Sequence, residues 1–133
     1  MPDAVRQAGL HLASRYRVRF DGPDILRYRN GNDSVAFHRD RSMRWLDDTL
    51  IGIVVLGEPR PFVLRPHGLG RDDVSSDVDV RPGRGDLIVM GGRAQADWLH
   101  AVPKIPRATE RVSFTWRWTA KSGPPDESAP YNA

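Results

Sequence analysis

Hydrophobic residues in this chain recur mainly at every second position, in short runs that turn residues interrupt. Residues 15–20 (RYRVRF) alternate strictly, which predicts a half-buried strand that ends in a turn at residues 21–24. Residues 3–14 have helical spacing instead. The alternation predicts further strands at residues 25–29, 34–38, 49–56, 61–65, 78–81, 86–90, 98–102 and 111–118. Many short strands after one helix predict a mainly β sandwich or barrel.

The longest apolar run is LIGIVVL, at residues 50–56. It has no polar face, which predicts a central strand buried on both sides, and it is too short to span a membrane. Residues 1–120 are predicted to form one domain, and the polar, proline-rich residues 121–133 are predicted to be disordered. The chain has no cysteine and does not begin like a secretory signal, so a cytoplasmic protein without disulfides is predicted.

Basic residues outnumber acidic ones, which leaves a net charge of +3. The isoelectric point near 9.8 favours a polyanionic partner. Nearly all the basic residues are arginine, the side chain that suits bidentate phosphate contacts, and the only lysines are Lys104 and Lys121. A GC-rich genome would produce the same arginine excess, so charge alone does not predict nucleic-acid binding.

The sequence HRD places two metal-binding side chains two positions apart. In a strand, His38 and Asp40 would point to the same face. His100, on a later predicted strand, can return across a barrel and complete a triangular ligand set that leaves other coordination positions open. A chance His-x-Asp pair is the alternative explanation. The two remaining histidines, His11 on the predicted helix and His67 in a glycine-containing loop, are expected to be structural or solvated.

The strand predicted near the end of the chain, RVSFTWR, has one polar and one apolar face. Arg111 and Arg117 share the polar face. If this face lines a barrel interior, two buried guanidinium groups require anions. A dicarboxylate would supply both charges, because arginine binds carboxylates through two parallel hydrogen bonds. The alternative is an exposed edge strand with solvated arginines.

Three segments, YRNGNDSVAFHRD (residues 28–40), WLHAV (residues 98–102) and RVSFTWR (residues 111–117), carry a family resemblance. In order and spacing they resemble the AlkB family of 2-oxoglutarate-dependent dioxygenases. The resemblance covers approximately residues 15–118. It implies a mainly β fold, the double-stranded β-helix or jelly roll, with one N-terminal helix.

The resemblance also implies roles for individual residues and two cofactors, Fe(II) and 2-oxoglutarate. Tyr28 would contact 2-oxoglutarate, and Arg111 would pair with its distal carboxylate. Arg117 would lie near the iron-chelating end and help to fix the aspartate ligand. The three Fe(II) ligands of the family match His38, Asp40 and His100.

The activity that the resemblance implies is oxidative demethylation of N-alkylated bases in DNA or RNA, by a monomer acting on a single-stranded or flipped-out base. Two departures bear on this expectation. Leu26 stands where the family often has an asparagine that contacts the co-substrate. Residues 41–44 (RSMR) stand where DNA-repair members commonly carry acidic residues that recognise the damaged base. Trp45 and Trp98 are further candidates for the substrate side.

The chain is also expected to lack an N-terminal section that supplies outer strands and a lid over the nucleotide in the family. Two other functions stay open. One is an AlkB-like oxygenase that acts on a protein or a small molecule. The other is a jelly-roll binding module without turnover.

Overall fold

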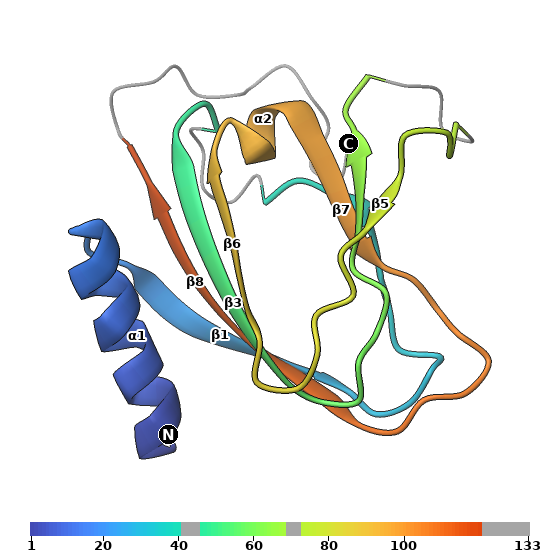
Figure 1. Cartoon of the computed structure of the whole chain (residues 1–133), viewed down its shortest axis with the longest axis horizontal. Helices are drawn as coiled ribbons and strands as arrows, with labels where there is room; N and C mark the ends of the chain where they lie inside the picture. Colours follow the sequence, from blue (N-terminus) through green and yellow to red (C-terminus); the bar gives the residue numbers. More distant parts are fainter. Residues whose placement is uncertain (41–45, 69–72, 121–133) are drawn as a thin grey trace.

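Two antiparallel sheets of four strands each face one another, with a helix outside the first sheet (Figure 1). The computed structural model describes residues 1–40, 46–68 and 73–120. The β3 sheet has the strand order β1-β8-β3-β6, and the β7 sheet has the order β2-β7-β4-β5. The elements are α1 (Asp3–Tyr16), β1 (Asp21–Tyr28), β2 (Val35–His38), β3 (Thr49–Gly57), β4 (Val63–Pro66), β5 (Val78–Asp79), β6 (Leu87–Gly92), α2 (Ala94–Asp97), β7 (Trp98–Val102) and β8 (Arg111–Thr119).

The predicted fold class is confirmed, since the described residues form a jelly roll behind one N-terminal helix. No helix among the described residues is long and apolar enough to cross a membrane. The tail at residues 121–133, predicted to be disordered, lies outside the described residues.

The strand predicted at residues 15–20 is wrong, and so is the turn predicted at residues 21–24. Helix α1 continues to Tyr16 and ends at Arg17, which adopts the left-handed conformation with a φ of 56°. β1 then begins at Asp21, opposite Arg117 of β8. Of the alternating apolar side chains, Tyr16 at the end of α1 and Phe20 just before β1 pack against the apolar cluster that α1 forms with β8. A strand also needs a partner, and the pairing of β1 with β8 begins only at Asp21.

The prediction that the apolar run forms a central strand is confirmed, because β3 lies between β8 and β6. Its inward side chains, Ile51, Ile53 and Val55, are buried between the two sheets. Its outward face packs under α1, and Gly52 permits this close approach. A Cβ atom at Gly52 would lie 2.8 Å from Cδ1 of Leu12. Residues 50–55 are therefore apolar because both faces of the strand are covered there, whereas Leu56 at the end of the run is exposed.

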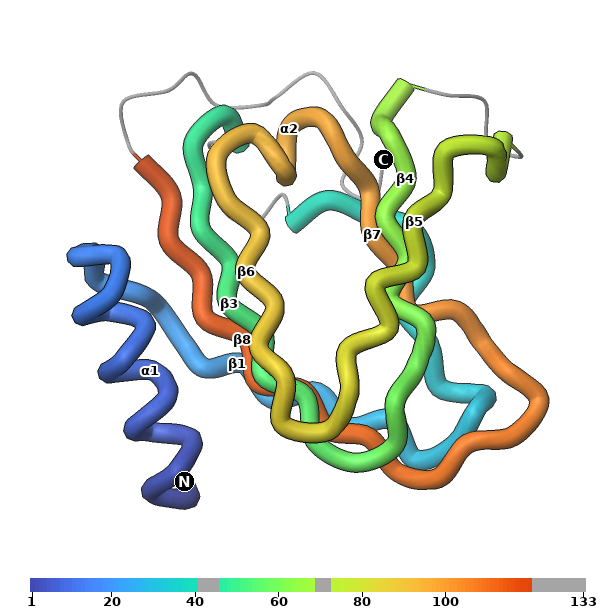
Figure 2. The backbone as a smooth tube through the Cα atoms, viewed as in Figure 1, coloured from blue at the N-terminus to red at the C-terminus, as the bar shows by residue number. Residues whose placement is uncertain are grey.

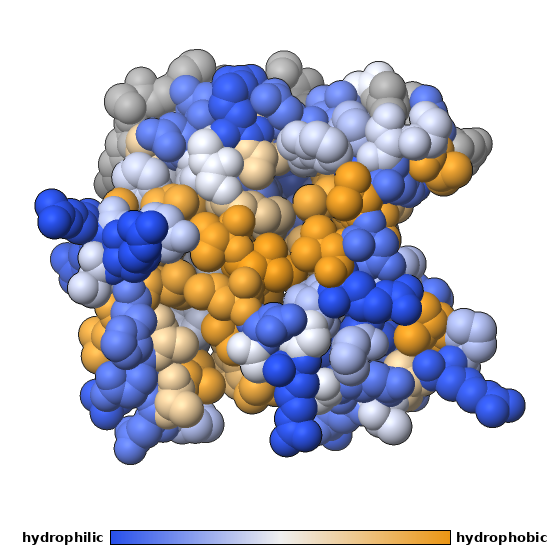
Figure 3. All heavy atoms as spheres, viewed as in Figure 1, coloured by the Kyte–Doolittle hydropathy of each residue, from blue (hydrophilic) through white to orange (hydrophobic). Residues whose placement is uncertain are grey.

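The space between the sheets holds the larger of two apolar clusters, which contains Tyr28, Leu46, Ile51, Ile53, Val55, Phe62, Met90 and Val102. In the tube view the β3 sheet and the β7 sheet lie on the two sides of this space (Figure 2). The space-filling view shows apolar side chains filling the middle of the same face, between α1 and the β7 sheet (Figure 3). The polar pocket described below lies inside this core.

One buried arginine holds the loops at one end of the sandwich together. Arg60, in the loop between β3 and β4, has no exposed surface. Its guanidinium donates to the carbonyl oxygens of Asn30 at 3.2 Å, Asp33 at 3.0 Å and Pro103 at 2.7 Å. These carbonyls belong to the loop after β1 and the loop after β7. Arg60 therefore connects three loops that are distant in sequence.

Replacing Arg60 with methionine is expected to lower the free energy of unfolding by at least about 3 kcal/mol, because three carbonyls lose a charged donor in the interior. Urea denaturation would measure the change. The matched control is Arg81→Met, since Arg81 is an exposed arginine that pairs with Asp79. The control should leave the midpoint unchanged within error. Equal midpoints for the two variants would contradict the role given to Arg60.

Candidate active site

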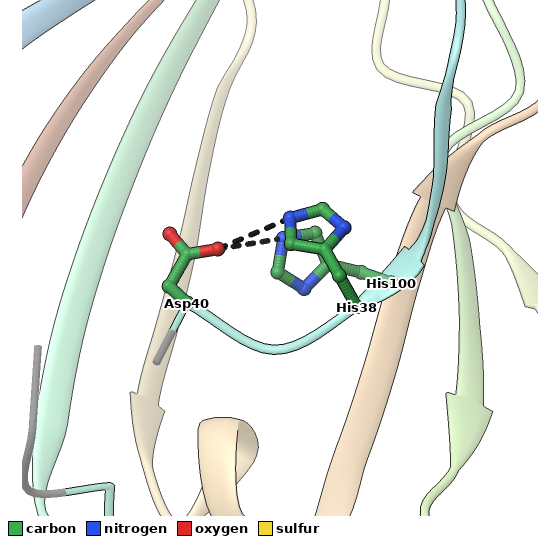
Figure 4. Close-up of side chains that lie close together, drawn as sticks. All are labelled: His38, Asp40 and His100. Carbon is green, nitrogen blue, oxygen red and sulfur yellow. Dashed lines mark ion pairs between the residues drawn. The ribbon is translucent and has the colours of Figure 1, made fainter. Parts of the chain in front are cut away.

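Two histidines face each other across a pair of strands, and an aspartate completes the group (Figure 4). His38 ends β2 and lies opposite His100 of β7, so both side chains leave the β7 sheet on the same side. Asp40 follows two residues after His38. Its Oδ1 lies 3.2 Å from Nε2 of His38 and 3.4 Å from Nε2 of His100. One donor atom from each residue lies within 4.8 Å of the others.

The donor set fits a divalent first-row metal ion such as Fe(II). Nδ1 of His38 lies 2.8 Å from the carbonyl oxygen of Ala36, and a carbonyl can only accept, so Nδ1 carries the proton. The ring therefore turns Nε2, its other nitrogen and the one that would bind a metal ion, toward Asp40. A histidine held in this way by a backbone carbonyl is typical of metal sites, because the bond orients the ring and selects its tautomer.

The protonation states of Asp40 and His100 also suit metal binding. Burial alone would raise the pKa of Asp40, but hydrogen bonds with His100 and His38 outweigh it and hold the pKa well below its ordinary value. Burial lowers the pKa of His100, which favours the neutral ring. Burial also acts to lower the pKa of His38, but its hydrogen bonds with Asp40 and Ala36 prevail and raise it. The group thus offers an ionised carboxylate and a neutral imidazole.

Arg117 holds the aspartate from the opposite sheet. Its Nε donates to Oδ2 of Asp40 at 2.6 Å, and its Nη1 donates to Asp24 of β1. Burial would lower the pKa of Arg117, but the charge of Asp40 raises it above its ordinary value. The second oxygen of Asp40 is thus occupied by Arg117, while the first faces the two histidines.

Arg111, at the start of β8, is a buried cation with free hydrogen-bond donors. It is 1% exposed, lies opposite Tyr28 of β1, and has its guanidinium carbon 4.8 Å from the centre of the Tyr28 ring. Burial lowers the pKa of Arg111, and its Nε and Nη1 have no hydrogen-bond partner among the described residues. A buried guanidinium with unused N–H donors fits a bound carboxylate, which would accept from it.

Burial raises the pKa of Tyr28, against the opposing charge of Arg111, so the phenol stays neutral. Its hydroxyl can then donate as well as accept. The burial of Arg111 and Ser113 shows that the polar face of β8 lines the interior. The alternative of an exposed edge strand with solvated arginines is therefore wrong for Arg111.

A cavity of about 80 Å³ connects these groups, several times the ~10–15 Å³ that one water molecule needs. The side chains that line it come from both sheets. They include all six residues singled out from the sequence: Tyr28, His38, Asp40, His100, Arg111 and Arg117. Fold and pocket together define a jelly-roll protein with a His-x-Asp…His group and a buried arginine with unused donors in one cavity.

Other positions named from the sequence lie less centrally. Leu26 lines the pocket opposite Ser113 and offers it no hydrogen-bonding group. Trp98 begins β7 and is half-buried. Residues 41–45, which include the remaining candidates for the substrate side, lie outside the described residues.

The interpretation of the sequence missed Gln95 and Asp24, which contact Asp40 and Arg117 respectively. Gln95 lies in α2, a single turn that is too short to produce a helical pattern. Asp24 was assigned to a turn. Only its pairing in β1, opposite Thr115, brings it to Arg117.

Comparison with known proteins agrees with this geometry. The family model described as the 2OG-Fe(II) oxygenase superfamily matches residues 1–117. Alpha-ketoglutarate-dependent dioxygenase alkB homolog 3 of Homo sapiens is 35% identical over 95 residues, which are 68% of this chain and 33% of the human protein. DNA oxidative demethylase ALKBH2 of Arabidopsis thaliana is 29% identical over 118 residues, 74% of this chain and 38% of the plant protein.

The chain therefore belongs to the 2OG-Fe(II) oxygenase superfamily and, within it, to the AlkB family. This confirms the resemblance drawn from the three sequence segments. The chain spans between a third and two fifths of the length of these two relatives, at 33% and 38%.

Proposed function

We propose that this chain carries the catalytic site of an Fe(II)- and 2-oxoglutarate-dependent dioxygenase that oxidatively demethylates N-alkylated bases of DNA or RNA. The observation that carries the proposal is the shared pocket, in which the metal-binding group and the unpaired guanidinium of Arg111 face the same cavity. The names of the relatives support both the chemistry and the nucleic-acid substrate.

His38, Asp40 and His100 would hold Fe(II), which, with 2-oxoglutarate and oxygen, supplies the oxidation of the substrate's alkyl carbon and yields succinate and carbon dioxide. Arg111 would bind the distal carboxylate of 2-oxoglutarate through a free guanidinium N–H. The neutral hydroxyl of Tyr28 would add a hydrogen bond at the same end. These contacts would orient the co-substrate toward the metal-binding group.

The burial of the metal-binding group bears on the form of the substrate. Asp40 and His100 are buried between the sheets, so a base stacked within a duplex cannot reach them. The base must be flipped out or belong to a single strand, and a single strand avoids the cost of unpairing. We therefore expect single-stranded DNA or RNA to be the better substrate.

The test is incubation of the protein with Fe(II), 2-oxoglutarate and a single-stranded oligonucleotide that carries one N-methylated base. Succinate and formaldehyde should appear in equal amounts, and omission of either cofactor should stop both. Succinate without demethylation would overturn the nucleic-acid substrate in favour of a protein or small molecule. No succinate under any condition, in a protein that binds Co(II), would indicate a binding module without turnover.

A further inference from the structure

Helix α2 reaches the active site through a single side chain that has no exposed surface. The backbone N–H of Asp40 donates to Oε1 of Gln95 at 2.8 Å, and both groups are buried. Strand β2 ends at His38, two residues earlier, so no strand pairing supports this part of the chain. The hydrogen bond to Gln95 takes the place of a sheet partner.

The two polar atoms of the Gln95 amide have contacts of unequal strength, because the oxygen accepts from the N–H of Asp40 and the nitrogen has a weaker contact. Its Nε2 lies 3.9 Å from Sδ of Met90, a weak acceptor in an apolar setting. A buried amide is costly unless its polar atoms are used, so the bond to Asp40 accounts for an amide at this position. A second contact joins the same segments, because Nη1 of Arg39 donates to the carbonyl oxygen of Ala96 in α2 at 3.4 Å.

Helix α2 also leads directly into the strand that carries His100, another residue of the metal-binding group. The helix ends at Asp97, and β7 follows at once with His100 as its third residue. A side chain in α2 therefore places Asp40 relative to the strand that carries His100. Arg117 holds the carboxylate of Asp40 at the same time, so this residue is held at both its peptide N–H and its side chain.

We propose that Gln95 is a positioning residue that sets the location of the Asp40 carboxylate and thereby the affinity of the site for a divalent metal ion. The inference rests on the proposed function, because it takes the three residues to be metal ligands. Loss of an outer hydrogen bond to a ligand typically costs about 10- to 100-fold in metal affinity. Gln95→Met keeps the length of the side chain and removes the acceptor.

The experiment measures Co(II) binding to the whole chain by calorimetry and records the absorption spectrum of the Co(II)-saturated protein. Gln95→Met should bind Co(II) about 10- to 100-fold more weakly than the parent protein, with an altered spectrum. The matched control is Thr49→Val, which removes the bond from another fully buried side chain, to the carbonyl of Gly92 at 3.4 Å. The control should lower the melting temperature yet keep the affinity within twofold and the spectrum unchanged.

Gln95→Asn provides a second route if the methionine variant does not fold, because it keeps a neutral amide but withdraws the oxygen from Asp40. It should weaken Co(II) binding in the same direction. A folded variant at position 95 with the parent affinity and spectrum would overturn the role of Gln95. Failure of the parent protein itself to bind Co(II) would instead overturn the proposed metal site.

Discussion

Replacing Asp40 with alanine is expected to abolish 2-oxoglutarate turnover in the presence of Fe(II). The loss should exceed about 100-fold, because removal of an outer partner of a ligand alone costs about 10- to 100-fold in metal affinity or activity. Asp40 supplies the carboxylate oxygen that faces both histidines, at 3.2 and 3.4 Å. Two histidines without this oxygen form an incomplete set for Fe(II). Succinate formation and Co(II) binding are the measurements.

The matched control for Asp40→Ala is Asp24→Ala. Asp24 is the other carboxylate that pairs with Arg117, but it is 75% exposed and does not belong to the metal-binding group. This control removes one carboxylate from the same arginine and should keep turnover within about tenfold of the parent. Retention of full activity in Asp40→Ala, or equal losses in the two variants, would contradict the assignment of Asp40 as a ligand.

Replacing Arg111 with methionine is expected to weaken 2-oxoglutarate binding by about 10- to 100-fold. A charge-assisted contact to a carboxylate is worth about 1.5–3 kcal/mol, and the distal carboxylate would lose this contact. Calorimetry on the Co(II)-loaded protein would give the dissociation constant. Affinity for Co(II) alone should change little, because Arg111 does not contact the metal-binding group in the described residues.

Stability should respond to Arg111→Met in the opposite sense to binding. Without a bound anion, Arg111 is a buried cation with two unsatisfied nitrogens, so an apolar side chain should leave the ligand-free protein as stable or more stable. Arg27→Met is the control, since Arg27 is an exposed arginine of β1 that pairs with Glu110. The control should change neither the stability of the ligand-free protein nor the dissociation constant for 2-oxoglutarate. An unchanged dissociation constant in Arg111→Met would contradict a role in binding the co-substrate.

Much of the fold was predictable because strand periodicity is local. The strand at residues 98–102 has the predicted bounds in the structure, and the apolar run at residues 50–56 forms the expected central strand. Residues 15–20 show where this reasoning fails. Their alternation reports that one side faces apolar surroundings, but it cannot distinguish a strand from a connecting segment packed under a helix.

The candidate site was likewise predictable from the sequence only in part. The motif around His38 and Asp40 was visible because both residues lie on one short segment. The prediction that His100 joins this motif rested on a family pattern. The structure explains the proximity, because His38 of β2 pairs with His100 of β7. No sequence signal marked Gln95, which is 55 residues from Asp40 along the chain.

The sequence by itself determined the order of the strands along the chain, the polar and apolar faces of β8, and the presence of His, Asp and Arg side chains suited to iron and a dicarboxylate. These properties depend on neighbours within a few residues. Only the tertiary structure decided that Arg111 is buried without an acidic partner, that Asp24 pairs with Arg117, and that Gln95 holds the backbone of Asp40. Each of these contacts joins elements that are distant in sequence, so it exists only once the two sheets have paired and packed.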